Sequence, residues 1–204
     1  MSEHLQVKEP KDRILDASAS LIAHKGFASV GVREIASAAD VNISMISYYF
    51  GGKVGILKAI IEEYFNDLKK IVTPLKDIES TPEDKMKAFI KELVLLIRTK
   101  TNLCKVAILE MPYDFPEITE FKLNLFMEHM KLIGCNFENI FTGIQNKYKH
   151  IIIGPAFISM IFSHFIFADM INSAYKIEFD DKFYDTYAEN IATLFLYGVK
   201  AINH

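Results

Sequence analysis

Cysteine is scarce in this chain of 204 residues, which contains only Cys104 and Cys135. The two cysteines are not part of a C-x-x-C or a mixed Cys/His spacing, so the sequence predicts neither a disulfide framework nor a metal site. The opening segment MSEHLQVKEPKDR is polar and lacks the apolar stretch of a signal peptide. We therefore expect a cytoplasmic protein with no bound metal and no cofactor.

A large excess of either charge is also missing. The chain has 23 Lys and Arg against 26 Asp and Glu, a net charge of −3, and residues 1–53 carry six side chains of each sign. Any surface that binds nucleic acid must therefore be a local arrangement of side chains. Signatures of catalysis are absent as well, since the sequence has no nucleophile elbow, no glycine-rich phosphate loop and no suitably spaced carboxylate pair. We expect a protein that is not an enzyme.

Strand-like alternation is rare, whereas apolar residues recur at three- and four-residue steps along most of the chain. This pattern predicts an all-α fold of about nine helices. The first three cover about residues 11–24, 32–39 and 43–50, and the second and third of them are short. Gly51 and Gly52 then break the chain before longer helices begin. We expect a small N-terminal domain, residues 1–53, and a larger helical domain, residues 54–204.

Residues 151–171, IIIGPAFISMIFSHFIFADMI, form a run long and apolar enough to suggest a membrane span. Pro155, Ser159, Ser163, His164 and Asp169 interrupt the run, and no basic cluster flanks it, which argues against a span. A helix that is apolar all round also suits a buried oligomer interface. We expect an interface and no membrane contact; a membrane-attached regulator is the alternative.

Two short helices joined by a tight turn at residues 40–42, and braced by a longer first helix, predict a helix-turn-helix. The third predicted helix is short enough to enter the major groove of DNA. It carries Tyr48 and Tyr49 side by side, and neighbours on a helix point about 100° apart, so both cannot face one core. An outward tyrosine could donate to a phosphate oxygen. It could equally be a rim residue of a packed helix.

Residues 13–57 resemble the DNA-binding domain of the TetR family of bacterial transcriptional repressors. The resemblance rests on RILDA at 13–17, Gly-Phe at 26–27, VREIA at 32–36, Ala39, Val41, Tyr-Phe-Gly at 49–51, and Lys53. Within this pattern Asp40 stands where the family usually has glycine, in a turn that favours positive φ. Ser47 stands where the family often has tyrosine, and Gly52 and Val54 replace the usual polar and acidic start of the next helix.

The predicted contacts with DNA combine phosphate binding with apolar base contacts. Arg33, Lys53, Ser29 and the tyrosine hydroxyls suit phosphate oxygens, whereas Ile43 and Met45 suit thymine methyl groups. The full set of predicted DNA-contact residues is Ser29, Arg33, Asn42, Ile43, Ser44, Met45, Ser47, Tyr48, Tyr49 and Lys53.

For the C-terminal part, the resemblance implies a domain that binds a small hydrophobic effector and forms a homodimer. The dimer would be built from the last two helices, at about residues 155–175 and 181–201, as a four-helix bundle. An aromatic- and methionine-rich interior suits an apolar ligand, although ordinary core packing is the alternative for each residue. The candidate effector-pocket residues are Phe89, Met111, Phe126, Met130, Phe162 and Phe165.

Together these features predict a repressor that binds a palindromic operator as a homodimer and is released by its effector. A different class of protein stays open because of the departures at Asp40, Ser47 and Gly52. In that alternative the chain is a helical small-molecule or lipid carrier whose DNA-binding module is weak or silent.

Overall fold

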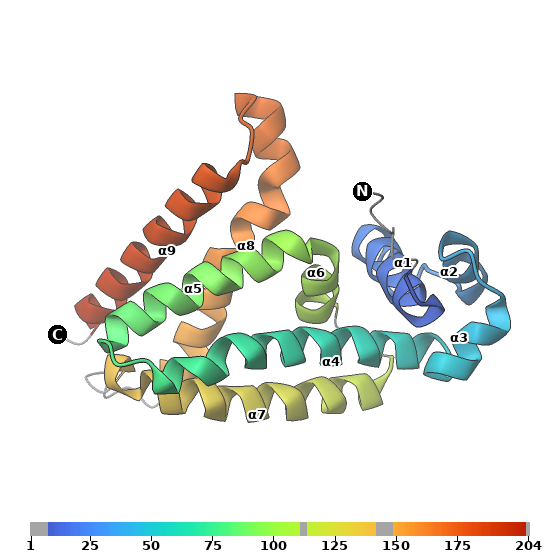
Figure 1. Ribbon diagram of the computed structural model, residues 1–204, viewed down its shortest axis with the longest axis horizontal. Helices are drawn as coiled ribbons and strands as arrows, with labels where there is room; N and C mark the ends of the chain where they lie inside the picture. The colour runs from blue at the N-terminus through green and yellow to red at the C-terminus, as the bar shows by residue number, and fades with distance from the viewer. Residues whose placement is uncertain (1–7, 111–113, 142–148, 203–204) are drawn as a thin grey trace, which may run out of the picture. The chain divides into compact units, whose positions relative to one another are not determined.

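The structure, a computed structural model, describes residues 8–110, 114–141 and 149–202. Within those residues the chain is built of helices, without a strand, so the predicted all-α fold is confirmed. The helices, shown in Figure 1, are α1 Pro10–Lys25, α2 Val32–Ala38, α3 Ile43–Phe50, α4 Lys53–Val72, a 3₁₀ turn Thr73–Asp77, α5 Pro82–Thr99, α6 Thr101–Leu109, α7 Pro116–Phe141, α8 Lys149–Tyr175 and α9 Asp181–Ile202.

Local signals explain most of the helix ends. Helix α1 ends at Gly26, whose φ of 79° suits glycine because a residue without Cβ meets no steric penalty there. Asn42 caps α3, since its side chain accepts a hydrogen bond from the backbone N–H of Ser44. Thr81 caps α5 in the same way through the N–H of Asp84.

The predicted start of α8 is wrong. We expected this helix at about residues 155–175, but it begins at Lys149 and contains Pro155. Proline removes the hydrogen bond that its missing N–H would donate one turn back, and its ring crowds the carbonyl four residues earlier. The other residues of this apolar run can still make helical hydrogen bonds, so the helix continues through the proline.

The chain divides into two compact units, Met1–Asp67 with Asn102–Glu128, and Leu68–Thr101 with His129–His204. In the first unit α1, α2 and α3 pack against one another, as Figure 1 shows. Their core contains Ile14, Ile22, Ile35 and Ile46, all buried. The boundary at residue 53, which divides the chain by expected function, stays a prediction.

The second unit is organised around α5, which packs along α9 and also contacts α8. Its core includes Phe89, Ile90, Leu93, Ile161 and Phe162, which are all buried. Two ion pairs tie α5 to the start of α9, between Lys91 and Asp185 and between Arg98 and Asp181.

Helix α8 is long and apolar enough to cross a membrane by length and composition alone, over Ile152–Tyr175 with a mean hydropathy of 1.6. Only 22% of its most apolar 18-residue window is buried. Six exposed residues of α8 recur every three or four positions and form a stripe along one side, namely Ile152, Ala156, Ser159, Ser163, Phe167 and Met170; Pro155, Ile166, Asp169 and residues 172–175 are exposed as well. Ile161, Phe162 and Phe165 are buried in the core, so the helix packs by one side and leaves much apolar surface exposed.

Candidate nucleic-acid interface

Helix α3 is anchored by one face and open on the other. Ile46 is 1% exposed, whereas Tyr48 is 82% exposed and Ile43 is 43% exposed. Ser44 and Ser47 are exposed as well, and Met45 is half-buried. An anchored helix with a free outer face is the geometry that a recognition helix requires.

The two adjacent tyrosines, Tyr48 and Tyr49, differ in how far they are exposed. Tyr49 is half-buried, and its ring lies between that of Tyr48, 4.9 Å away edge to face, and that of Phe50, 6.4 Å away. The Tyr48 ring therefore packs against that of Tyr49, while Tyr48 itself stays largely exposed. Of the pair, Tyr48 is the residue free to contact a neighbouring molecule.

The other predicted DNA-contact residues also lie at the surface of this unit. Ser29, Arg33 and Asn42 are exposed. The Asn42 side-chain oxygen is used within the protein, because it accepts from the backbone N–H of Ser44 at 2.9 Å and from its hydroxyl at 2.8 Å. Only the amide NH₂ of Asn42 therefore remains to donate to DNA.

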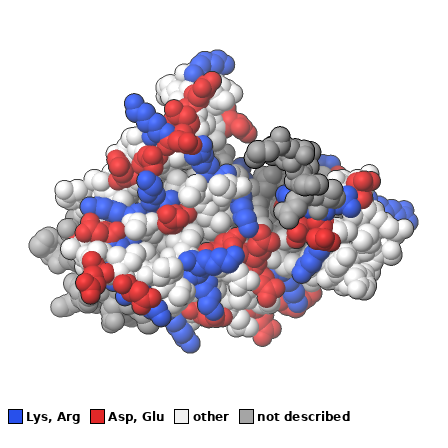
Figure 2. Space-filling model, viewed as in Figure 1, with Lys and Arg blue, Asp and Glu red and all other residues white. Residues whose placement is uncertain are grey.

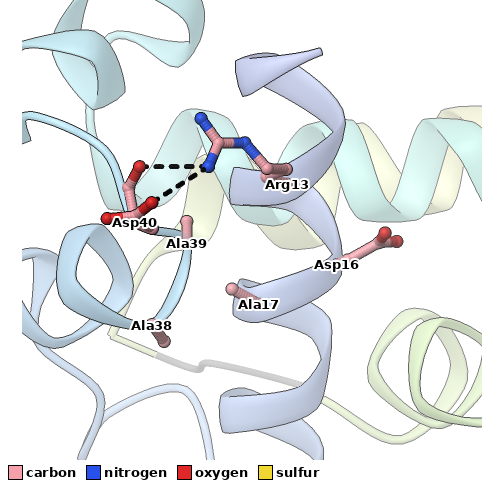
Figure 3. Close-up of a pocket in the computed structure, with 6 residues that line it drawn as sticks. All are labelled: Arg13, Asp16, Ala17, Ala38, Ala39 and Asp40. Carbon is pink, nitrogen blue, oxygen red and sulfur yellow. Dashed lines mark hydrogen bonds and ion pairs between the residues drawn. The ribbon is translucent and has the colours of Figure 1, made fainter. Parts of the chain in front are cut away.

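The turn between α2 and α3 depends on Asp40, whose φ of 52° confirms the expected left-handed conformation. Arg13 reaches from α1 and donates to the Asp40 carbonyl oxygen at 3.1 Å, and its guanidinium lies 3.6 Å from the Asp40 carboxylate. Figure 3 shows these contacts beside a surface pocket of about 440 Å³, with Asp16 directed away from the guanidinium. The hydrogen bond from Arg13 goes to the backbone carbonyl of residue 40. Arg13 can therefore hold the turn in the same way with any side chain at position 40.

Lys53 makes contacts within the protein that the sequence did not predict. Its Nζ donates to the carbonyl oxygen of Val30 at 2.7 Å and to that of Ala28 at 3.4 Å. It also lies 4.3 Å from the centre of the Phe27 ring, a cation–π contact. Partial burial lowers the pKa of the Lys53 amine. The predicted phosphate contact of Lys53 stays a prediction, but here its donors hold the loop before α2.

A second cluster, which no sequence pattern predicts, includes Glu110 and Lys122. The Glu110 carboxylate accepts from the backbone N–H of Phe27 at 3.2 Å. The Lys122 Nζ donates to the carbonyl oxygens of Ile108 and Glu110 at 2.9 and 3.1 Å. Burial lowers the pKa of Lys122 to about 8, and the nearby Glu110 charge offsets part of that effect.

Lys122 should make the stability of the protein depend on pH in the alkaline range. Its pKa is about 8 in the folded chain and 10.5 for an exposed lysine, so between pH 8 and 10 the unfolded chain binds more protons and stability rises with pH. Replacing Lys122 with methionine removes this gain, about 1 kcal/mol after allowing for solvent screening. Urea unfolding at pH 7.5, 8.5 and 9.5 would measure it, with the exposed Lys131→Met as control. Parallel curves for wild type and Lys122→Met would contradict the prediction.

The predicted effector-pocket residues differ in burial and in the compact unit to which they belong. Phe89, Phe162 and Phe165 are buried in the second unit, and Met130 is half-buried there. Phe126 is 45% exposed and belongs to the first unit, and Met111 lies outside the described residues. The Phe89 ring lies 5.5 Å from that of Phe137 and 6.0 Å from that of Phe157, which is core packing. The effector pocket therefore stays a prediction.

Groups that would indicate other chemistry are missing from the part of the chain that the structure describes. No cluster of three or more His, Cys, Asp or Glu side chains suited to a metal ion occurs there. Cys104 is buried and forms no disulfide. On the face shown in Figure 2, Lys and Arg side chains are interspersed with Asp and Glu, so that face has no broad basic patch.

Comparison with known proteins agrees with this geometry. The family described as "Bacterial regulatory proteins, tetR family" matches residues 14–60. The "Probable HTH-type transcriptional regulator YttP" of Bacillus subtilis is 43% identical over 60 residues, which make up 29% of this chain and 29% of that protein.

Two solved structures share the fold over nearly the whole chain. The fatty acid degradation regulator FadR of Bacillus halodurans has a TM-score of 0.70 at 19% identity, covering 95% of this chain and 97% of that one. FadR of Bacillus subtilis, solved in complex with stearoyl-CoA, has a TM-score of 0.69 at 20% identity, covering 92% and 98%.

The described residues thus form an anchored helix-turn-helix followed by a larger helical part. Residues 14–60 match the model of the TetR family of bacterial regulatory proteins, and the chain shares its fold with the two solved structures.

Proposed function

We propose that this protein is a ligand-responsive repressor that binds a palindromic DNA operator as a homodimer in the cytoplasm and is released by a small hydrophobic effector. The observation that carries the proposal is the outer face of α3, where a capped and anchored helix presents Tyr48 at 82% exposure. Tyr48 shares this exposed face with Ile43, Ser44 and Ser47, and a free helix face opposite a packed one is what a recognition helix presents to DNA.

On DNA, α3 enters the major groove with Ile43 and Met45 toward the bases. Tyr48 and Ser47 contact the phosphate backbone beside the groove. Arg33 and Ser29, around the amino end of α2, bind neighbouring phosphates, which the partial positive charge of the helix end also attracts. The Asp40 carboxylate in this surface is an opposing charge and is fully exposed.

In the second unit, the exposed stripe of α8 and the exposed Leu194 and Tyr197 of α9 pack against the same surface of a second copy. A two-fold axis through such a bundle places two recognition helices on the two halves of a palindrome. The complex of Bacillus subtilis FadR with stearoyl-CoA supports an effector that contains an acyl chain. To act as a switch, the effector must prefer the conformation that does not bind DNA by about 1–3 kcal/mol.

The test is fluorescence anisotropy with the DNA that flanks the gene of this protein, measured across a salt series against scrambled DNA. Wild type is expected to bind specifically, with log Kd rising steeply with log salt because bound phosphates release counterions. Arg33→Ala should weaken binding to all sequences and reduce the salt slope by about one counterion. The exposed Lys131→Ala, on α7, is the control that removes one positive charge outside the predicted interface.

Tyr48→Phe is a second variant in the same assay, since it keeps the ring and removes only the hydroxyl. Loss of a hydrogen bond to a phosphate should weaken binding by about tenfold or more, since hydrogen bonds to charged groups contribute about 1.5–3 kcal/mol. If wild type binds neither this DNA nor any fragment in a genome-wide selection, while still binding hydrophobic ligands, the carrier function replaces the repressor.

A further inference from the structure

The loop between α1 and α2, residues 26–31, carries Ser29 and leads into the amino end of α2. Its own hydrogen bonds are long, at 3.3 Å from the Ser29 N–H to the Gly26 carbonyl and 3.4 Å from the Val30 N–H to the Phe27 carbonyl. Bonds of that length lie at or beyond the upper end of the usual range. The path of this loop therefore depends on contacts that other segments supply.

Those contacts converge on Phe27, which is 2% exposed. Its N–H donates to the Glu110 carboxylate, and its ring meets the edge of the Phe115 ring with centres 5.6 Å apart. Lys53 covers the ring and binds the carbonyl of Val30. The first two contacts come from the segment between α6 and α7, more than 80 residues along the chain.

Glu110 is itself held in place. Lys122, on α7, donates to the carbonyl oxygens of Ile108 and Glu110. These carbonyls end α6, where carbonyl groups lack helical partners and a cation is favourable. A chain of contacts thus runs from Lys122 through the end of α6 and Glu110 to the N–H of Phe27, all within the first compact unit.

We propose that Glu110 and Lys122, which lie outside the helix-turn-helix, are positioning residues for DNA binding. They hold the loop at residues 26–31 in the path that presents Ser29, one of the predicted phosphate contacts. This inference rests on the proposed function, and it assigns part of the DNA-binding geometry to Glu110, at the end of α6, and Lys122, on α7.

The direction in which DNA affinity changes when Glu110 is replaced distinguishes a positioning role from a purely electrostatic effect of its charge. Glu110 is acidic, so if it acted on DNA only through its charge, removing it would strengthen binding. A positioning role requires the opposite result, because a loop free to move must be ordered again when DNA binds.

The decisive variants change one property of Glu110 at a time. Glu110→Ala removes the acceptor, and Glu110→Asp keeps the charge but draws the acceptor back from the Phe27 N–H. Glu110→Gln keeps an acceptor at full length without the charge. The exposed Glu117→Ala, at the start of α7, is the control for loss of one negative charge nearby.

Two measurements are made on each full-length variant after its folding is checked by circular dichroism. Hydrogen exchange of the peptide that covers residues 26–31, without DNA, reports the loop alone. Anisotropy across a salt series reports DNA affinity. We expect Glu110→Ala and Glu110→Asp to exchange at least tenfold faster in this peptide and to bind about tenfold more weakly with an unchanged salt slope. Glu110→Gln should stay within about twofold of wild type in both.

Lys122→Met, compared with the exposed Lys131→Met, should repeat the Glu110→Ala result, since it removes both bonds to the end of α6. The inference is overturned if Glu110→Ala leaves the exchange unchanged, or if it binds DNA as tightly as wild type or more so. Failure of wild type to bind any DNA would instead reject the proposed function. The exchange data would still decide whether Glu110 holds the loop.

Discussion

Gly55→Ala is expected to be among the most damaging single substitutions in this chain, although it adds only one methyl group. Gly55 lies in the first turn of α4, and a Cβ there would overlap the backbone carbonyl oxygen of Phe50 at the end of α3. Neither backbone can move away freely, because Ile46 of α3 and Ile56 and Leu57 of α4 are all buried. The two helices must therefore shift relative to each other, which displaces the recognition helix.

The expected cost is about 3 kcal/mol from the clash, offset by less than about 1 kcal/mol from the better helix propensity of alanine. DNA affinity should fall by more than about tenfold in protein that remains folded, since base contacts depend on the placement of α3. Urea unfolding and anisotropy would measure the two effects separately.

Gly134→Ala is the matched control for this prediction. Gly134 lies inside α7, and a Cβ added there would meet nothing within 4 Å. This substitution should stabilise the protein by about 0.5–1 kcal/mol, because alanine loses less conformational entropy in a helix. If both variants gained stability alike, the close contact between α3 and α4 would not exist as described.

The connection between α3 and α4 also shows which features of the fold could be predicted from the sequence. Gly51 and Gly52 were expected to break the chain, and both have positive φ, at 68° and 116°. The role of Gly55 was not foreseen, because a glycine within a helix gives no local signal of what approaches it. Periodicity predicts which face of a helix is buried, but not which backbone atom lies against it.

The same distinction holds for the candidate interface. The cap at Asn42, the left-handed Asp40 and the exposed face of α3 follow from residues close together in sequence, and all three were predictable. The contacts of Lys53 with Val30 and of Glu110 with Phe27 join residues 23 and 83 positions apart. No pattern within one helix encodes such pairs, since they arise only when the helices pack. The prediction of where α8 begins was wrong for the opposite reason. Pro155 is a strong local signal for a helix start, and the apolar run on both sides overrode it.

The second large effect is expected from Leu194→Glu on α9. Leu194 is 62% exposed, and Tyr197, one turn further, is 72% exposed. In the proposed dimer this face of α9 lies against the partner, so the two-fold axis introduces each new charge twice. A charge buried without a partner costs several kcal/mol, and a standard dimer interface of about 1,600 Å² has little surplus to offset two such charges.

Leu194→Glu should therefore convert the protein from dimer to monomer, as measured by light scattering during size-exclusion chromatography. Affinity for a full palindromic operator should then fall by about 100-fold or more, because each half-site is bound independently. Binding to a single half-site should be unchanged, which shows that the helix-turn-helix itself is intact. The control is Leu123→Glu on α7, at a leucine that is 54% exposed and lies outside the proposed interface. A Leu194→Glu protein that remained dimeric would place the interface elsewhere and leave the exposed stripe of α8 without its proposed partner.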